Sequence, residues 1–185
     1  MPELTTAQLE NVQIDYGIIY TNYGELDSKL IGPTRGGGEF KATATIRQIE
    51  FDGQKGETKD LKVVEDINAS LTVVTLDTSM ATLALAMPWA TYDDVAGTIT
   101  AGSANVGIIP AESYLKNVTM FAKTIKGEYR KITLYNAMSD KDFELAAKPK
   151  GEGEVGLEIK AHWDSTDETS NLFLVETVAD LTVPV

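Results

Sequence analysis

The sequence predicts a mainly β protein, a β-sandwich or barrel with one flanking α-helix. Apolar and polar residues alternate along most of the chain, as is typical of strands that bury one face. One segment departs from this period, because apolar residues from Met80 to Met87 follow the i, i+3, i+4, i+7 spacing of a helix. Asp77 or Thr78 is the expected N-cap and Pro88 ends the pattern, so we expect this helix over about 77–87.

Two neighbouring segments predict a long β-hairpin. Alternation runs over about 40–51 and again over about 61–76, and the residues of 52–56 have the composition of a turn. Both strands exceed the usual five or six residues, so we expect them to extend beyond the core. The apolar phase changes after Ile46, which predicts a β-bulge or a strand corner.

The rest of the chain predicts shorter strands and two irregular regions within one domain over 1–185. Residues 1–39 predict a flexible arm and loop, and Gly, Ala, Ser and Thr in 88–113 predict a loop-rich insertion with a hairpin. Arg35-Gly36-Gly37-Gly38 lacks the spacing of a phosphate loop and precedes a strand, so it predicts a flexible loop. The further strands are expected over 12–20, 115–125, 129–135, 143–147, 155–163 and 172–178.

Composition argues against most catalytic classes. The net charge is −12, which disfavours binding to a nucleic-acid backbone, since phosphate contacts need clustered Lys and Arg. The chain has no cysteine and a single histidine, His162, so triads and multi-histidine metal sites are improbable. No stretch reaches the roughly 20 apolar residues of a membrane helix. We expect no enzyme activity, no cofactor and no membrane partner.

Two other candidate sites remain open. Asp164, Asp167 and Glu168 are the candidates for a carboxylate-only metal site, although EF-hand spacing is absent and we expect no metal. A ligand- or carbohydrate-binding β-sandwich is the alternative function, and it would need an exposed aromatic platform. Trp89, Tyr92 and Trp163 are the residues that could form one.

Two segments carry a resemblance to a known family. Residues 17–71 contain the turn motif Ile46, Ile49, Asp52, Gly53, Gly56, and residues 142–166 close on Lys160-Ala161-His162-Trp163-Asp164. In this order the two segments resemble phage tail tube (major tail) proteins of long, non-contractile tails. That family is related in fold to the inner tubes of contractile injection devices.

The resemblance implies a structural protein of the virion tail that is made in the host cytoplasm. Six copies would form a ring, and rings would stack through N-terminal arms and loops, including 35–38, into a tube that DNA traverses without specific binding. Tape measure, tail terminator and distal tail proteins are the further partners that it implies.

The resemblance also assigns the long hairpin to the wall of the tube. The lumen or assembly candidates are the polar residues of its two strands. The cations among them either pair with Glu and Asp of neighbouring copies, or they point to the ring interface and other strands line the channel. A net acidic lumen would repel the DNA backbone. A mildly basic region around 123–131 within an acidic chain suits head-to-tail assembly. The candidates are Lys41, Thr43, Thr45 and Arg47 on one strand and Lys62, Asp66, Asn68, Ser70 and Thr72 on the other.

Overall fold

The computed structural model describes residues 4–14, 17–145, 151–167 and 169–181. It confirms the mainly β class, with 44% of residues in strands and 11% in helices. Most strands belong to one large antiparallel sheet, and β5 and β6 form a separate two-stranded hairpin. In the described part of the chain, no helix is long and apolar enough to cross a membrane.

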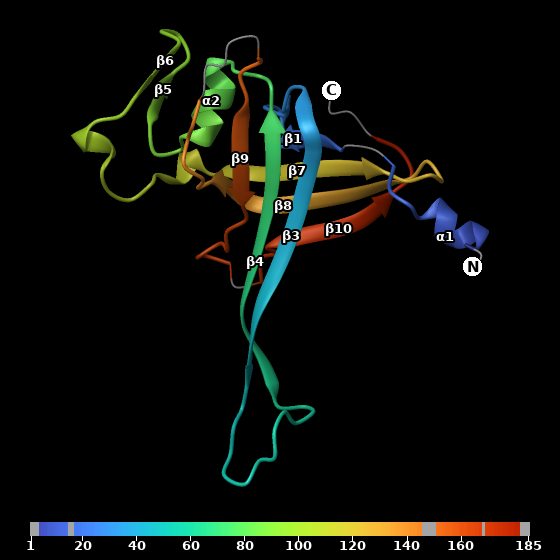
Figure 1. Cartoon of the computed structure of the whole chain (residues 1–185). Coiled ribbons are helices and arrows are strands. Elements are labelled where there is room, and N and C mark those ends of the chain that lie inside the picture. The colour runs from blue at the N-terminus through green and yellow to red at the C-terminus, as the bar shows by residue number, and fades with distance from the viewer. Residues whose placement is uncertain (1–3, 15–16, 146–150, 168, 182–185) are drawn as a thin grey trace.

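The elements follow one another in the order labelled in Figure 1. The helices are α1 (Thr6–Glu10), α2 (Met80–Ala86) and the 3-10 turns η1 (Ser103–Asn105) and η2 (Ala111–Ser113). The strands are β1 (Ile18–Thr21), β2 (Lys29–Leu30), β3 (Thr34–Gln48), β4 (Lys62–Thr75), β5 (Thr91–Asp93), β6 (Thr98–Thr100), β7 (Leu115–Lys123), β8 (Tyr129–Ser139), β9 (Val155–Lys160) and β10 (Phe173–Val178).

The large sheet folds over on itself in two layers. Its order is β2-β1-β7-β8-β9-β4-β3, with β10 paired to β8 as well. In Figure 1, β7, β8 and β10 run across the molecule while β9, β4 and β3 run along it. The end of β8 joins the layers, since Met138 and Ser139 pair with Lys160 and Ile159 of β9. Among the described residues the sheet does not close into a barrel.

The core lies between the two layers. Alternate residues of β4 and β9 point into it, so the period-2 pattern of these strands is explained by one buried face. Phe40 of β3 packs against the edge of this cluster and lies beside Phe173, with ring centroids 5.4 Å apart. The buried cluster includes Ile19, Leu71, Val73, Val118, Met120, Leu134, Val155, Leu157 and Ile159.

The flanking helix α2 confirms the prediction over 77–87, with a different cap. The Ser79 side chain accepts the hydrogen bond from the Thr82 amide, so Ser79 is the N-cap. Asp77 stabilises this cap from outside, because its carboxylate accepts bonds from the Ser79 amide (2.9 Å) and the Thr82 hydroxyl (2.7 Å). The buried face carries Thr82 and Ala86, and Met80 is exposed.

The Gly-rich run is part of a strand, which corrects the prediction of a loop. Arg35 to Gly38 lie at the start of β3, with a register shift between Thr34 and Gly38. Gly36 and Gly37 have φ values of +80° and +77°, a conformation that favours glycine, so they form a bulge within the strand. Glycine at 38 also lets β3 pass close over the core.

Several other boundaries differ from the sequence expectation. The first strand begins at Ile18, preceded by an isolated bridge from Gln13 to Thr124. The short helix α1 was not predicted; Thr5 and Gln8 form its capping box. Phe143 to Leu145 form no strand, and residues 146 and 147 lie outside the described residues. Residues 88–113 contain the β5–β6 hairpin and the two 3-10 turns.

Candidate assembly surface

The β3–β4 hairpin extends well beyond the core. From Ala69 to Thr75, β4 alternates buried and half-buried residues, whereas every residue from Lys62 to Asn68 is exposed. On β3, Lys41 to Arg47 are exposed. Figure 1 shows this half of the hairpin standing away from the body, with its turn at the far end.

One face of the projecting hairpin is apolar. Ala44 lies opposite Ile67 and Ile46 lies opposite Val64. Directly opposed residues share a face, so this face continues the one on which Phe40 and Leu71 meet the core. Ile46 remains 58% exposed. A two-stranded hairpin is marginally stable alone in water, and exposed apolar patches mark interaction sites.

A β-bulge separates the two ends of this face. Thr45 pairs with Asp66, but Ile46 pairs with Val64, so Glu65 is an extra residue on β4. Its carboxylate accepts a hydrogen bond from the side chain of Arg47. The bulge that the sequence predicted after Ile46 is not found within β3, which alternates regularly to its end at Gln48; the extra residue lies on the partner strand β4.

The bulge changes the grouping of the candidate lumen residues. Lys62 pairs with Gln48, which shares the face of Ile46, so Lys62 lies on the apolar face, contrary to the sequence grouping. The physical reason is that one extra residue, Glu65, inverts the side-chain alternation beyond it. The opposite, polar face holds Lys41, Thr43, Thr45 and Arg47 of β3 with Ser70, Asn68 and Asp66 of β4; Thr72, two residues beyond Ser70, continues it.

The polar face carries little net charge. Arg47 is paired with Glu65 within the same chain. Asn68 donates a hydrogen bond of 2.7 Å to Asp66. Arg47 is therefore neutralised within its own chain, whereas Lys41 has no ion pair among the described residues, and Glu39, opposite Thr72, adds a further carboxylate to this face.

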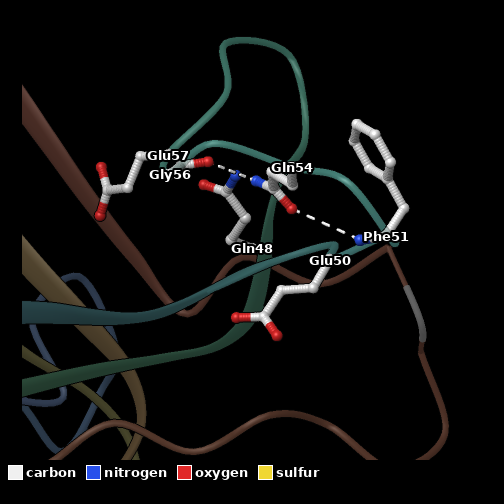
Figure 2. A pocket seen from close by; sticks show the side chains of 6 residues that line it. All are labelled: Gln48, Glu50, Phe51, Gln54, Gly56 and Glu57. Atoms are coloured by element: carbon white, nitrogen blue, oxygen red, sulfur yellow. Dashed lines mark hydrogen bonds between the residues drawn. The ribbon is translucent and has the colours of Figure 1, made fainter.

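The tip of the hairpin is organised by one side chain. Gln54 Oε1 accepts a hydrogen bond from the Phe51 amide (3.4 Å), while Nε2 donates to the Gly56 carbonyl (2.6 Å), as Figure 2 shows. Nε2 also lies 3.3 Å from the Thr58 hydroxyl. The Phe51 ring lies apart from the other side chains drawn in Figure 2 and is 57% exposed. The tip therefore presents an aromatic side chain from a defined backbone.

A small cavity of about 440 Å³ lies beneath the tip. Both amide atoms of Gln48, which lines it, are buried without a hydrogen-bond partner in the structure. An unpaired buried polar group costs about 1–3 kcal/mol, so the tip is a region where stability is lost.

The predicted stacking segment 35–38 is anchored to the C-terminal half of the chain. Arg35 forms ion pairs with Glu152 (2.8 Å) and with Glu154. These contacts raise the pKa of Arg35, chiefly through the hydrogen bond to Glu152, and they lower the pKa of Glu152.

The alternative metal and aromatic sites are not assembled in the described residues. The carboxylates of Asp164 and Asp167 are hydrogen-bonded within their own turns to Thr166 and Thr169, and Glu168 lies outside the described residues. No group of three metal-binding side chains is found in the described part of the chain. Trp89 and Tyr92 line one cavity of the insertion, but Trp163 is not part of its lining.

The single histidine, His162, is held in place by contacts with Asn136 and Tyr114. His162 Nδ1 lies 2.9 Å from the Asn136 carbonyl oxygen, and Asn136 Nδ2 donates to the His162 carbonyl (3.3 Å). The ring also meets Tyr114 edge-on, at 5.1 Å between centroids. This reciprocal pair links the end of β8 to the segment after β9.

The basic region around 123–131 is largely engaged within the chain. Lys126 pairs with Glu128 (2.7 Å) and Lys131 with Glu176 (2.8 Å). Arg130 donates to the Asn11 side chain at 2.7 Å. The cations therefore contribute less free positive charge than the sequence suggested.

No family profile and no curated protein matches the sequence. Among solved structures, a chain of the anti-feeding prophage baseplate is 14% identical, with a TM-score of 0.48, covering 89% of this chain and 94% of that one. A chain of the tail of an empty gene transfer agent particle is 9% identical, with a TM-score of 0.45 and coverages of 80% and 92%.

A third neighbour is the Hcp protein, 14% identical, with a TM-score of 0.32 and coverages of 77% and 86%. By their names, the first two neighbours are components of a prophage baseplate and of a particle tail, the kind of protein that the sequence resemblance named. At such identities and TM-scores the similarities do not assign the chain to a family.

Proposed function

We propose that the chain is a structural subunit that assembles with copies of itself into the tube of a phage-like tail. The observation that carries this proposal is the projecting half of the β3–β4 hairpin. Its apolar residues Ile46, Val64 and Ile67 lie on the same face of the hairpin as the residues that enter the core. They remain exposed and pack against no other element of the described chain. Burying that face in an assembly would supply the hydrophobic stabilisation that the hairpin lacks in one copy.

The sheet also has an open edge suited to a ring. β3 ends the strand order, so the outer N–H and C=O groups of its 15 residues face no further strand in the described chain. Such edges are templates for pairing with another chain. Pairing of β3 with an edge strand of the next copy is a heterologous contact, which closes into a ring when the rotation permits. The sequence resemblance implies six copies.

The polar face of the hairpin is the proposed lumen wall. Lys41, Thr43, Asp66 and Asn68 point to this side, and Arg47 is neutralised by its ion pair with Glu65. With a net charge of −12 per copy, the long-range field of the ring would repel the DNA backbone and allow passage without specific binding. The virion tail is the proposed location, with tape measure, terminator and distal tail proteins as partners.

Negative-stain microscopy and sedimentation across a concentration series test this function. We expect rings or tubes, and we expect Ile67→Asp to abolish them because a charge would enter the buried face. Leu26→Asp is the matched control, since Leu26 is fully exposed in the β1–β2 loop region and should tolerate the charge. A wild-type protein that stays monomeric at high concentration would refute the proposal.

A further inference from the structure

We propose that a cavity in the 88–113 insertion is the docking site for the hairpin tip of a second copy of this chain. The inference rests on the proposed self-assembly and assigns to it a specific contact between successive rings. It identifies a role for the part of the sequence that carried no resemblance.

The cavity has the size and lining of a binding pocket. Its volume is about 680 Å³, within the usual range for pockets that hold a ligand or an anchoring side chain. The side chains around it are unusually exposed, with Ile108 at 100% and Val106 at 85%. Its apolar and aromatic lining comprises Trp89, Tyr92, Val106, Ile108, Ile109 and Pro110.

The hairpin tip has the matching shape. Phe51 is a projecting aromatic ring, and Ile49, two residues before it, is exposed as well. Because Gln54 holds the Phe51 backbone through its amide, the ring is presented without a large loss of backbone entropy on binding. Aromatic side chains that fill pockets are the usual anchors of protein interfaces.

The two surfaces lie at opposite ends of the molecule. Figure 1 shows the hairpin turn at one end of the molecule and the β5–β6 hairpin beyond the opposite end of β3 and β4, to one side of their axis. A copy that is displaced along the hairpin direction and rotated about the tube axis would bring its tip to the insertion of a copy in the next ring. Such a contact is heterologous, and because it includes a translation along the axis it repeats as an open stack.

Charged groups around the two surfaces can pair individually. Residues 88–113 contain Asp93, Asp94 and Glu112 and no Lys or Arg. At the tip, Lys55 and Lys59 have no carboxylate within salt-bridge distance among the described residues. The tip also carries acidic residues and has no net positive charge, so apolar burial drives the contact and lysine–carboxylate pairs orient it.

Site-directed cross-linking tests the contact, because the native chain has no cysteine. Phe51→Cys and Ile108→Cys proteins are prepared separately, mixed, allowed to assemble and treated with a short bismaleimide. We expect covalent dimers in the mixture, and a ladder of multimers from the double variant. Each single variant alone should give no dimer, and Leu26→Cys mixed with Phe51→Cys is the matched exposed control.

The outcomes separate this inference from the proposed function. Dimers from Phe51→Cys alone would mean that tips meet each other and would overturn the inference. The same holds if wild-type tubes are visible but the mixture does not cross-link, or if Ile108→Cys alone gives dimers. A wild-type protein that forms no rings refutes the proposed function, and this inference with it.

Charge insertion gives a second readout that does not depend on cross-linking geometry. Phe51→Asp and Ile108→Asp change exposed side chains, so both variants should fold as the wild type does by circular dichroism. We expect each to keep forming rings but to raise the concentration needed for stacking by about tenfold or more. Normal stacking of both variants would overturn the inference while leaving ring formation intact.

Discussion

Gly38 of β3 lies directly against Met120 of β7: a Cβ built on Gly38 would be 2.8 Å from Met120 Sδ. The same Cβ would lie 2.9 Å from Ile19 Cδ1. Met120 and Ile19 are both buried, so neither can move away freely. The strand that carries the assembly hairpin thus crosses the core at a position where only a hydrogen atom fits.

Gly38→Ala should therefore destabilise the fold. We expect a loss of about 1–3 kcal/mol in the free energy of unfolding, the usual cost of overpacking a core. Chemical denaturation of the unassembled protein measures it. Gly102→Ala is the control, because a Cβ there meets nothing within 4 Å and the φ of −150° suits any residue. Equal stability of the two variants would contradict the close approach.

The N-cap of α2 predicts that the stability of the fold depends on pH. The hydrogen bond from the Thr82 hydroxyl, followed by that from the Ser79 amide, holds the pKa of Asp77 below its ordinary value of 3.8. Because the folded-state pKa is depressed, the ionised carboxylate contributes stability above the unfolded pKa and loses it as the pH falls through the folded pKa.

Asp77→Asn removes this ionisation, which makes the effect measurable. We expect the variant to be less stable than the wild type near neutral pH, and the difference in unfolding free energy to shrink as the pH drops below 3.8. Thermal or urea unfolding over a pH series measures it. A difference that stays constant through the acid range would refute the assignment.

Substituting the single histidine should spare assembly. His162→Ala loses the contact between Nδ1 and the Asn136 carbonyl, at a cost of about 1 kcal/mol in stability. Assembled rings and tubes should form as in the wild type, because the imidazole of His162 contacts Tyr114 of the same subunit. Loss of an enzymatic activity in this variant would overturn the structural role proposed for the chain.

Limited proteolysis tests which segments are accessible. If residues 1–39 formed a flexible arm and loop, as the sequence predicted, trypsin would cut early near Lys29 or Arg35. Arg35 lies in a paired strand with two ion pairs, whereas Lys55 and Lys59 lie in the exposed tip.

We therefore expect the monomer to be cut first at Lys55 or Lys59, and these sites to become protected in the tube. Mass spectrometry of the early fragments reads the order of cleavage. Faster cleavage at Arg35 than at the tip would restore the original expectation of a flexible loop.

The sequence alone determined the elements whose period is set by one buried face. The alternation in 61–76 and 155–163 reflects strands whose alternate residues enter the core, so it is visible without a structure. The helical spacing of 80–87 located α2, but the residues that the helix buries are Thr82 and Ala86 rather than the predicted apolar stripe. The length of the long hairpin was visible too. The resemblance carried by 17–71 and 142–166 pointed to assembly rather than catalysis.

Only the tertiary structure decided where β3 begins and on which face of the hairpin the side chains of β4 lie. Glycine at 36–38 signals a loop by composition, and only the packing of Gly38 on Met120 shows that it is needed within a strand. The extra residue Glu65 inverts the alternation and moves Lys62 to the apolar face, which depends on pairing with β3. Pairing and close approach join residues far apart in the chain, so local periodicity cannot encode them.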